Sequence, residues 1–71
     1  MTKDKRVGWL YTDGGLNVRL PGLTQPEKFP DTNSGATQAR DYISAQIGCN
    51  WSLENMGYLG YRIILHEEVP A

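Results

Sequence analysis

The chain has 71 residues, a mass of 8.0 kDa, a formal net charge of −1 and a pI near 5.6. With 39% hydrophobic and 21% charged residues it has the composition of a folded protein, and its length predicts one domain over residues 1–71. The small negative charge disfavours a nucleic-acid partner, and the single cysteine, Cys49, excludes an internal disulfide and a thiolate-based structural zinc site.

Residues 1–6 combine Lys3, Lys5 and Arg6 with polar neighbours, and we expect them to form a frayed basic lead-in to the first strand. No uninterrupted apolar run follows them. The sequence therefore predicts neither a signal peptide nor contact with a membrane, and we expect a cytoplasmic protein.

Residues 7–12 and 16–20 flank Asp13-Gly14-Gly15 and predict a β-hairpin. Asp13-Gly14 suits a two-residue type I′ loop, which would pair Trp9 with Val18. That register gives an inner face of Val7, Trp9, Tyr11, Leu16, Val18 and Leu20, and an outer face of Gly8, Leu10, Asn17 and Arg19. A three-residue loop would instead place Trp9 opposite Arg19, so the apolar pattern argues against it.

Residues 21–34 contain three prolines and predict a long loop, either functional or a simple crossover, with Phe29 as its anchor to the core. A helix should begin near Ser34, after a run of capping residues, and end at Gly48. Its buried stripe is expected to consist of Ala36, Ala39, Ile43 and Ile47.

The region after the helix allows two interpretations. Residues 52–55 are expected to form a short helical turn, and the alternative is a plain loop with Trp51 beneath the helix end. Residues 58–69 predict a last strand that turns Leu59, Tyr61, Ile63 and Leu65 toward the helix.

An antiparallel position beside the first strand would bring Glu67 and Glu68 near Lys5 and Arg6. The expected fold class is therefore α+β: a small ββαβ domain whose three-stranded sheet has the order 2-1-3, antiparallel neighbours and one helix packed on one face. In this topology the second and third strands are edges, and either edge could form a homodimer with a second copy.

Few residues could carry chemistry. Cys49 follows the helix end and His66 lies on a strand beside two glutamates, so we expect an inert thiol and a surface histidine. A hydrolase built on this pair would need the two side chains within hydrogen-bond reach. The carboxylates are dispersed. We therefore expect no enzyme activity, no catalytic residue, no cofactor and no metal.

The outer face of the predicted sheet is the main candidate for binding. Aromatic, apolar and arginine side chains on an exposed sheet face are typical of protein interfaces. The residues expected to bind a partner are Leu10, Arg19, Tyr58, Arg62, Ile64 and His66. The same face could stack on single-stranded nucleic acid, and an ordinary solvent-exposed sheet also carries an occasional Leu or Ile.

Residues 11–47 show the Asp13-Gly14-Gly15 turn, then Val18, Pro21, Leu23 and Thr24, and then a helix with spaced alanines at Ala36 and Ala39. This arrangement resembles the antitoxin domain of HicB-type toxin-antitoxin pairs. The resemblance implies a strand pair, a helix, a third strand and the occlusion of a small RNase toxin, and it assigns no site residues.

In general type the chain is also similar to small phage-encoded inhibitors, anti-CRISPR proteins among them. Our leading hypothesis is a non-enzymatic protein-binding module, a small phage-type inhibitor for anti-defence or host takeover, that occludes a larger protein complex. The alternatives are a nucleic-acid-binding module that uses the exposed sheet face and an antitoxin-like domain that neutralises a small toxin.

Overall fold

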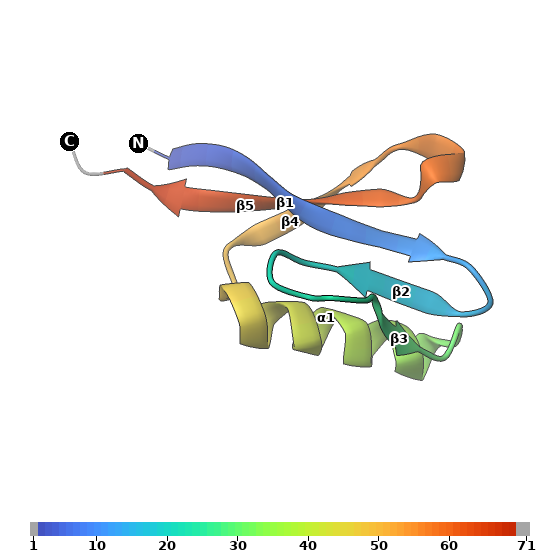
Figure 1. The fold of residues 1–71 in the computed structure, drawn as a ribbon. Coiled ribbons are helices and arrows are strands. Elements are labelled where there is room, and N and C mark those ends of the chain that lie inside the picture. The colour runs from blue at the N-terminus through green and yellow to red at the C-terminus, as the bar shows by residue number, and fades with distance from the viewer. Residues whose placement is uncertain (1, 70–71) are drawn as a thin grey trace.

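The computed structural model describes residues 2–69 and shows a twisted antiparallel sheet with one helix across one face (Figure 1). The expected α+β class is confirmed, but the sheet has five strands instead of three, in the order β3-β2-β1-β5-β4. The elements are β1 (Thr2–Thr12), β2 (Leu16–Arg19), β3 (Glu27–Phe29), α1 (Asn33–Ile47), β4 (Trp51–Asn55), the short 3-10 helix η1 (Gly57–Leu59) and β5 (Tyr61–Glu68).

The three central strands β2, β1 and β5 have the predicted order, and the antiparallel pairing of β1 with β5 is confirmed. Thr2 pairs with Glu68, and Lys5 Nζ lies 3.9 Å from Glu67 Oε1, as the charge argument requires. Residues 2–6 are thus part of the longest strand, and the expected frayed lead-in is wrong for them. Met1 lies outside the described residues.

The hairpin register differs from the predicted one. Leu10 pairs with Val18, and Trp9 pairs with Arg19, so the loop has three residues. The reason lies in the backbone: Gly14 (φ 68) and Gly15 (φ 139) take the positive φ angles, and Asp13 is spared the left-handed conformation that a type I′ loop would demand of it. One residue of shift turns Trp9 and Tyr11 outward and Leu10 inward.

The side chain of Asn17 caps this three-residue loop by hydrogen bonds to its backbone. This side chain is 2% exposed, and its Nδ2 donates to the carbonyl oxygens of Asp13 and Gly15, each at 3.2 Å. Asn17 lies on the face of the sheet that was predicted for it, opposite Tyr11 and away from α1, but its side chain is buried because its amide caps the loop.

We expect Asn17→Ala to lower the free energy of unfolding by about 1–3 kcal/mol, because two loop carbonyls lose a buried donor. Asn17→Asp should cost more, since a carboxylate would face those carbonyls as an acceptor. Urea denaturation measures both, with Lys28→Ala as the control, because Lys28 is the exposed partner of Asn17 on β3. Equal midpoints for Asn17→Ala and the control would contradict the cap.

The core lies between α1 and the inner face of the sheet, where α1 packs mainly against β2 and β3 (Figure 1). Its fully or nearly buried apolar residues are Leu10, Val18, Leu20, Ala39, Ile43 and Ile63. Val18, Leu20 and Ile63 were predicted inward correctly. Leu59 and Tyr61 were expected to face the helix but are 51% and 44% exposed.

Helix α1 begins one residue before its predicted start. Thr32 is the N-cap, and its Oγ1 accepts a hydrogen bond from the amide of Gly35 at 3.0 Å. Gly48 ends the helix with φ 85, as expected from its position. Of the predicted stripe, Ala39 and Ile43 are buried and Ile47 is half-buried, whereas Ala36 is exposed.

Two short strands lie where none was predicted. β3 forms within the proline-rich segment 21–34, and its last residue Phe29 packs on Tyr42 of α1 with ring centroids 5.7 Å apart, so the expected anchoring role of Phe29 is confirmed. β4 replaces the helical turn expected over residues 52–55. Its first residue, Trp51, donates from Nε1 to Ser44 Oγ at 2.9 Å and ties β4 to α1.

These additions change the sheet edges, which are β3 and β4 and not β2 and the last strand. Pairing of an edge with a second copy stays a prediction. Across residues 2–69, no helix combines the length and apolar character that a membrane span requires.

Candidate functional site: the outer face of the sheet

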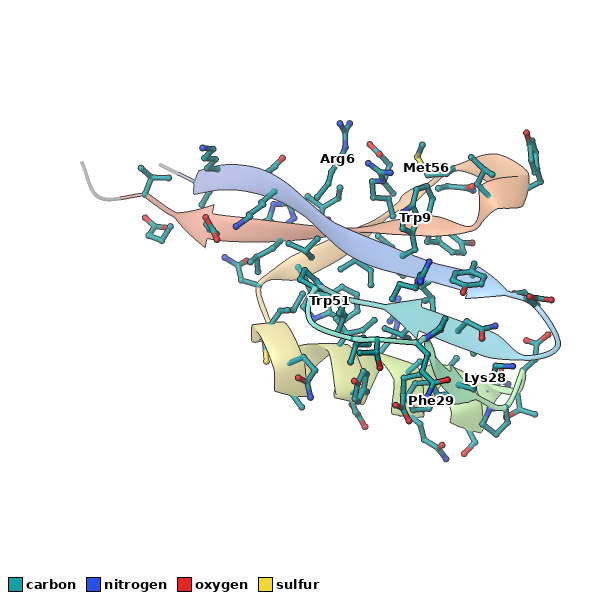
Figure 2. All side chains as sticks on the ribbon, viewed as in Figure 1. Arg6, Trp9, Lys28, Phe29, Trp51 and Met56 are labelled. Atoms are coloured by element: carbon teal, nitrogen blue, oxygen red, sulfur yellow. The ribbon has the colours of Figure 1, made fainter. Side chains whose placement is uncertain are left out.

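The side of the sheet that faces away from α1 is here called the outer face. It carries the aromatic, arginine and hydrogen-bonded polar side chains that could form a functional site. Figure 2 shows Arg6 and Trp9 projecting from this side, whereas Trp51 points toward α1. The register assigns the following residues to the outer face: Asp4, Arg6, Trp9, Tyr11, Arg19, Ser52, Glu54, Arg62, Ile64 and His66.

The structure does not place all six residues that were expected to bind a partner on the outer face. Arg19, Arg62, Ile64 and His66 lie on the outer face, and Tyr58 lies in η1 at the turn before β5. Leu10 does not belong with them, because it is only 9% exposed and packs in the core. Its predicted placement on the outer face is wrong, as a consequence of the hairpin register.

One half of the outer face is a row of aromatic and arginine side chains. Arg19, Trp9 and Arg62 are direct neighbours across β2, β1 and β5. The guanidinium Cζ of Arg62 lies 4.3 Å from the centroid of the Trp9 ring, which is a cation–π contact. Arg62 Nε is buried and has no hydrogen-bond partner within the described residues. Arg62 is therefore half-buried, with its guanidinium in contact with the Trp9 ring.

Beside this row lies an open groove of about 280 Å³, lined by Trp9, Tyr11, Arg19 and Leu59. At the turn next to it, Tyr58 is 99% exposed. Among residues 2–69, no carboxylate lies within ion-pair distance of Arg19. An apolar groove, an uncovered tyrosine and an unpaired cation are therefore found together at one end of the sheet.

The other half of the outer face contains a hydrogen-bonded trio from three adjacent strands. His66 Nδ1 lies 2.6 Å from Asp4 Oδ1, and His66 Nε2 lies 2.8 Å from Ser52 Oγ. Asp4 comes from β1, His66 from β5 and Ser52 from β4. The Asn50 side chain donates from Nδ2 to the carbonyl oxygen of His66 at 2.7 Å, so the backbone at His66 is held as well.

A groove of about 730 Å³ contains this trio, and its other lining residues include Arg6, Leu53, Glu54 and Ile64. Figure 2 shows Arg6 projecting away from the sheet. Its Nη2 atom lies 4.0 Å from Glu54 Oε1. Both side chains of that pair are largely exposed, so the pair is weak and Arg6 is available to other groups.

Cys49 takes no part in the trio. It lines a separate hollow of about 530 Å³ between α1 and β4, with Ser44 and Trp51, and both ring nitrogens of His66 bond to Asp4 and Ser52 instead. Within residues 2–69, no three His, Cys, Asp or Glu side chains are grouped so that they could hold a metal ion.

Sequence reasoning missed six outer-face residues, which are Asp4, Arg6, Trp9, Tyr11, Ser52 and Glu54. Trp9 and Tyr11 were assigned to the core, and Asp4 was placed in the frayed lead-in. Ser52 was placed in a helical turn, although the alternation of Trp51 and Leu53 with Ser52 and Glu54 is a strand signal. Comparison with protein-family models, with curated proteins and with solved structures finds no match to this chain.

Proposed function

We propose that this protein is a binding module that recognises a larger protein through the aromatic and arginine half of its outer face. We call this surface the aromatic–arginine patch: Trp9, Tyr11, Arg19, Tyr58, Leu59 and Arg62. The observation that carries the proposal is the exposure of Tyr58, at 99%, next to the apolar groove at Trp9, Tyr11 and Leu59. Trp, Tyr and Arg are the residue types that dominate binding energy at protein interfaces.

The patch is also arranged to bind with little reorganisation. Trp9 and Arg62 are fixed by their mutual stacking and by the central strands that carry them. Rigid aromatic anchors lose little conformational entropy when they bind. The surface is small, as befits a 71-residue chain, so the partner is expected to be larger and to be occluded where the patch covers it. This supports an inhibitor that acts by steric occlusion.

Charge indicates the chemistry of the partner surface. Arg19 is an exposed cation without an ion pair among the described residues, and it borders an apolar groove. A partner that presents an apolar side chain beside a carboxylate would complement both features. The patch therefore favours an acidic and apolar protein surface.

The test compares the unmodified chain with three variants in affinity capture from a nuclease-treated bacterial lysate. Arg19→Glu and Tyr58→Ala should each weaken retention of a discrete protein by about tenfold or more, because each removes an interface anchor. Arg40→Glu is the matched control: it makes the same charge change at an exposed position of α1. Circular dichroism checks that all variants fold. Equal retention by all forms would contradict the proposal.

A second candidate is single-stranded nucleic acid, which is favoured by the presence of Trp9, Tyr11, Arg19 and Arg62 on one face. Aromatic rings and guanidinium planes stack on bases, and arginines neutralise phosphates. Affinity for a labelled single-stranded oligonucleotide would then fall steeply with salt, whereas a largely apolar protein interface responds weakly. Retention that is lost after nuclease treatment would select this candidate.

A further inference from the structure

The geometry points to Ser52 as an activated nucleophile for acyl transfer, with His66 as its general base and Asp4 as the residue that positions His66. This inference goes beyond the binding proposal and uses the other half of the outer face.

The hydrogen-bond order within the trio is the order that such chemistry needs. When neutral His66 carries its proton on Nδ1, it donates that proton to Asp4 at 2.6 Å, and its free Nε2 accepts the hydroxyl proton of Ser52 at 2.8 Å. The same connectivity, hydroxyl to Nε2 and Nδ1 to carboxylate, is used by serine hydrolases on unrelated folds. The arrangement is recognised by these roles and not by sequence order.

The positions of the three side chains are fixed by the sheet. Asp4 and His66 are direct partners in the pairing of β1 with β5, and Ser52 pairs with Ile64, two residues before His66 on the same face. The side chain of His66 is only 29% exposed, although Asp4 beside it is 67% exposed. The imidazole therefore lies between its two partners, with most of its surface covered.

The edge of the sheet supplies a donor for the negative charge that develops on an attacked carbonyl. His66 N donates to Asn50 O, and Met56 N donates to Gly60 O. In an antiparallel pair, hydrogen-bonded positions alternate along the strand. Between Asn50 and Met56, the even-numbered residues are therefore the ones whose backbone groups hydrogen-bond across to the β5 side. The amide of Leu53, the residue after the nucleophile, consequently points toward the open edge. An amide at this position is a frequent oxyanion donor, and the guanidinium of Arg6 lines the same groove.

The expected substrates are esters of small carboxylic acids, whose acyl group would lie over Ile64 in the groove. Ser52 Oγ bonds to the carbonyl carbon while its proton passes to His66 Nε2. The bond to the leaving oxygen then breaks, and His66 returns the proton to that oxygen. Water next attacks acyl-Ser52, again through His66, and releases the carboxylic acid and free Ser52.

The test uses the full chain and an alkyl fluorophosphonate, which phosphonylates activated serines with loss of fluoride. Peptide mass mapping follows the labelling of each serine over time. Ser52 should be labelled roughly 10²- to 10⁴-fold faster than Ser34, the range that a positioned general base contributes. Ser34 is an internal control, because it is exposed and shares the same chain and solution.

Variants then assign the roles. His66→Gln should bring the labelling of Ser52 down to the rate of Ser34, and Ser52→Ala should remove the adduct. Asp4→Asn should slow labelling, and Asp4→Glu should restore part of it, which a purely structural role for Asp4 would not require. Labelling of Ser52 no faster than Ser34 in the unmodified chain would overturn the inference, with no variant needed.

The same experiment separates this inference from the binding proposal. Ser52→Ala leaves the aromatic–arginine patch intact and should retain a captured partner like the unmodified chain. Arg19→Glu should leave the labelling of Ser52 unchanged. In the unmodified chain, partner capture without fast labelling of Ser52 would mean that the nucleophile inference has failed, and fast labelling without capture would mean that the binding proposal has failed.

Discussion

Gly8→Ala is expected to cost about 3 kcal/mol or more of unfolding free energy, because the added methyl group would meet the backbone of the neighbouring strand. Gly8 lies on β1 just after the irregularity between Arg6 and Gly8, where the pairing with β5 shifts. A Cβ added there would overlap the backbone carbonyl oxygen of Arg19 on β2 and would crowd Leu20. Because the obstacle is backbone of a neighbouring central strand, no side-chain rotation relieves it.

Gly22→Ala is the matched control. Gly22 has φ 89, which penalises a side chain, but no atom lies within 4 Å of its added Cβ. This variant should lose only about 1 kcal/mol, the usual cost of placing alanine in the left-handed region. Urea midpoints of the two variants, measured together, separate steric overlap from backbone preference. A Gly8→Ala midpoint at or above that of Gly22→Ala would show that β1 and β2 do not approach each other as described.

The strand β1 also shows why the sequence predicted only part of this fold. Over residues 8–11 both of its faces lack polar side chains: Trp9 and Tyr11 alternate with Gly8 and Leu10, so period-two alternation cannot choose between them. Which of the two faces turns toward the helix depends on the loop. Gly15 allows a third loop residue, and the buried side chain of Asn17 caps the loop. On β2, where Val18 contrasts with Arg19, the inward residue was predicted correctly.

The two additional strands were missed for different reasons. β3 has three residues, two of them charged, within a proline-rich segment, so it carries no periodic signal and forms only because β2 offers an open edge. β4 does alternate, but residues 52–55 also fit a short helical turn, and the prediction of that turn was wrong. Pairing with β5, which is a tertiary effect, decides in favour of the strand.

The candidate catalytic trio could not be predicted from local sequence patterns. Asp4 and His66 are 62 positions apart, and they become neighbours only because β1 extends back to Thr2 and the pairing shifts at the irregularity before Gly8. The charge pattern did place β1 and β5 side by side. Which residues face each other within that pair depends on a single-residue shift, and a shift of that size changes every pair that follows.

Ile43→Ala is expected to detach α1 from the sheet. Gly35, Ala39 and Ile43 are the buried residues of this helix, and Ile43 is the only large side chain among them, with no exposed surface. Removing a buried isoleucine side chain costs about 2–5 kcal/mol, because apolar contacts are lost and a cavity remains. A chain of this length has a total stability of roughly 4–11 kcal/mol, so the loss is a large part of it.

Ile47→Ala provides the comparison, since Ile47 lies one turn further along α1 and is only half-buried. It should lose less than half as much stability as Ile43→Ala. In Ile43→Ala, amide hydrogen exchange should accelerate first in α1 and β3, whereas β1 and β5 keep their protection because they pair with each other over most of their length. Uniform acceleration across all strands would instead show that helix and sheet unfold as one unit. In the first case the outer face survives loss of the helix, because the strands that carry the trio and most of the aromatic–arginine patch do not depend on Ile43 for their pairing.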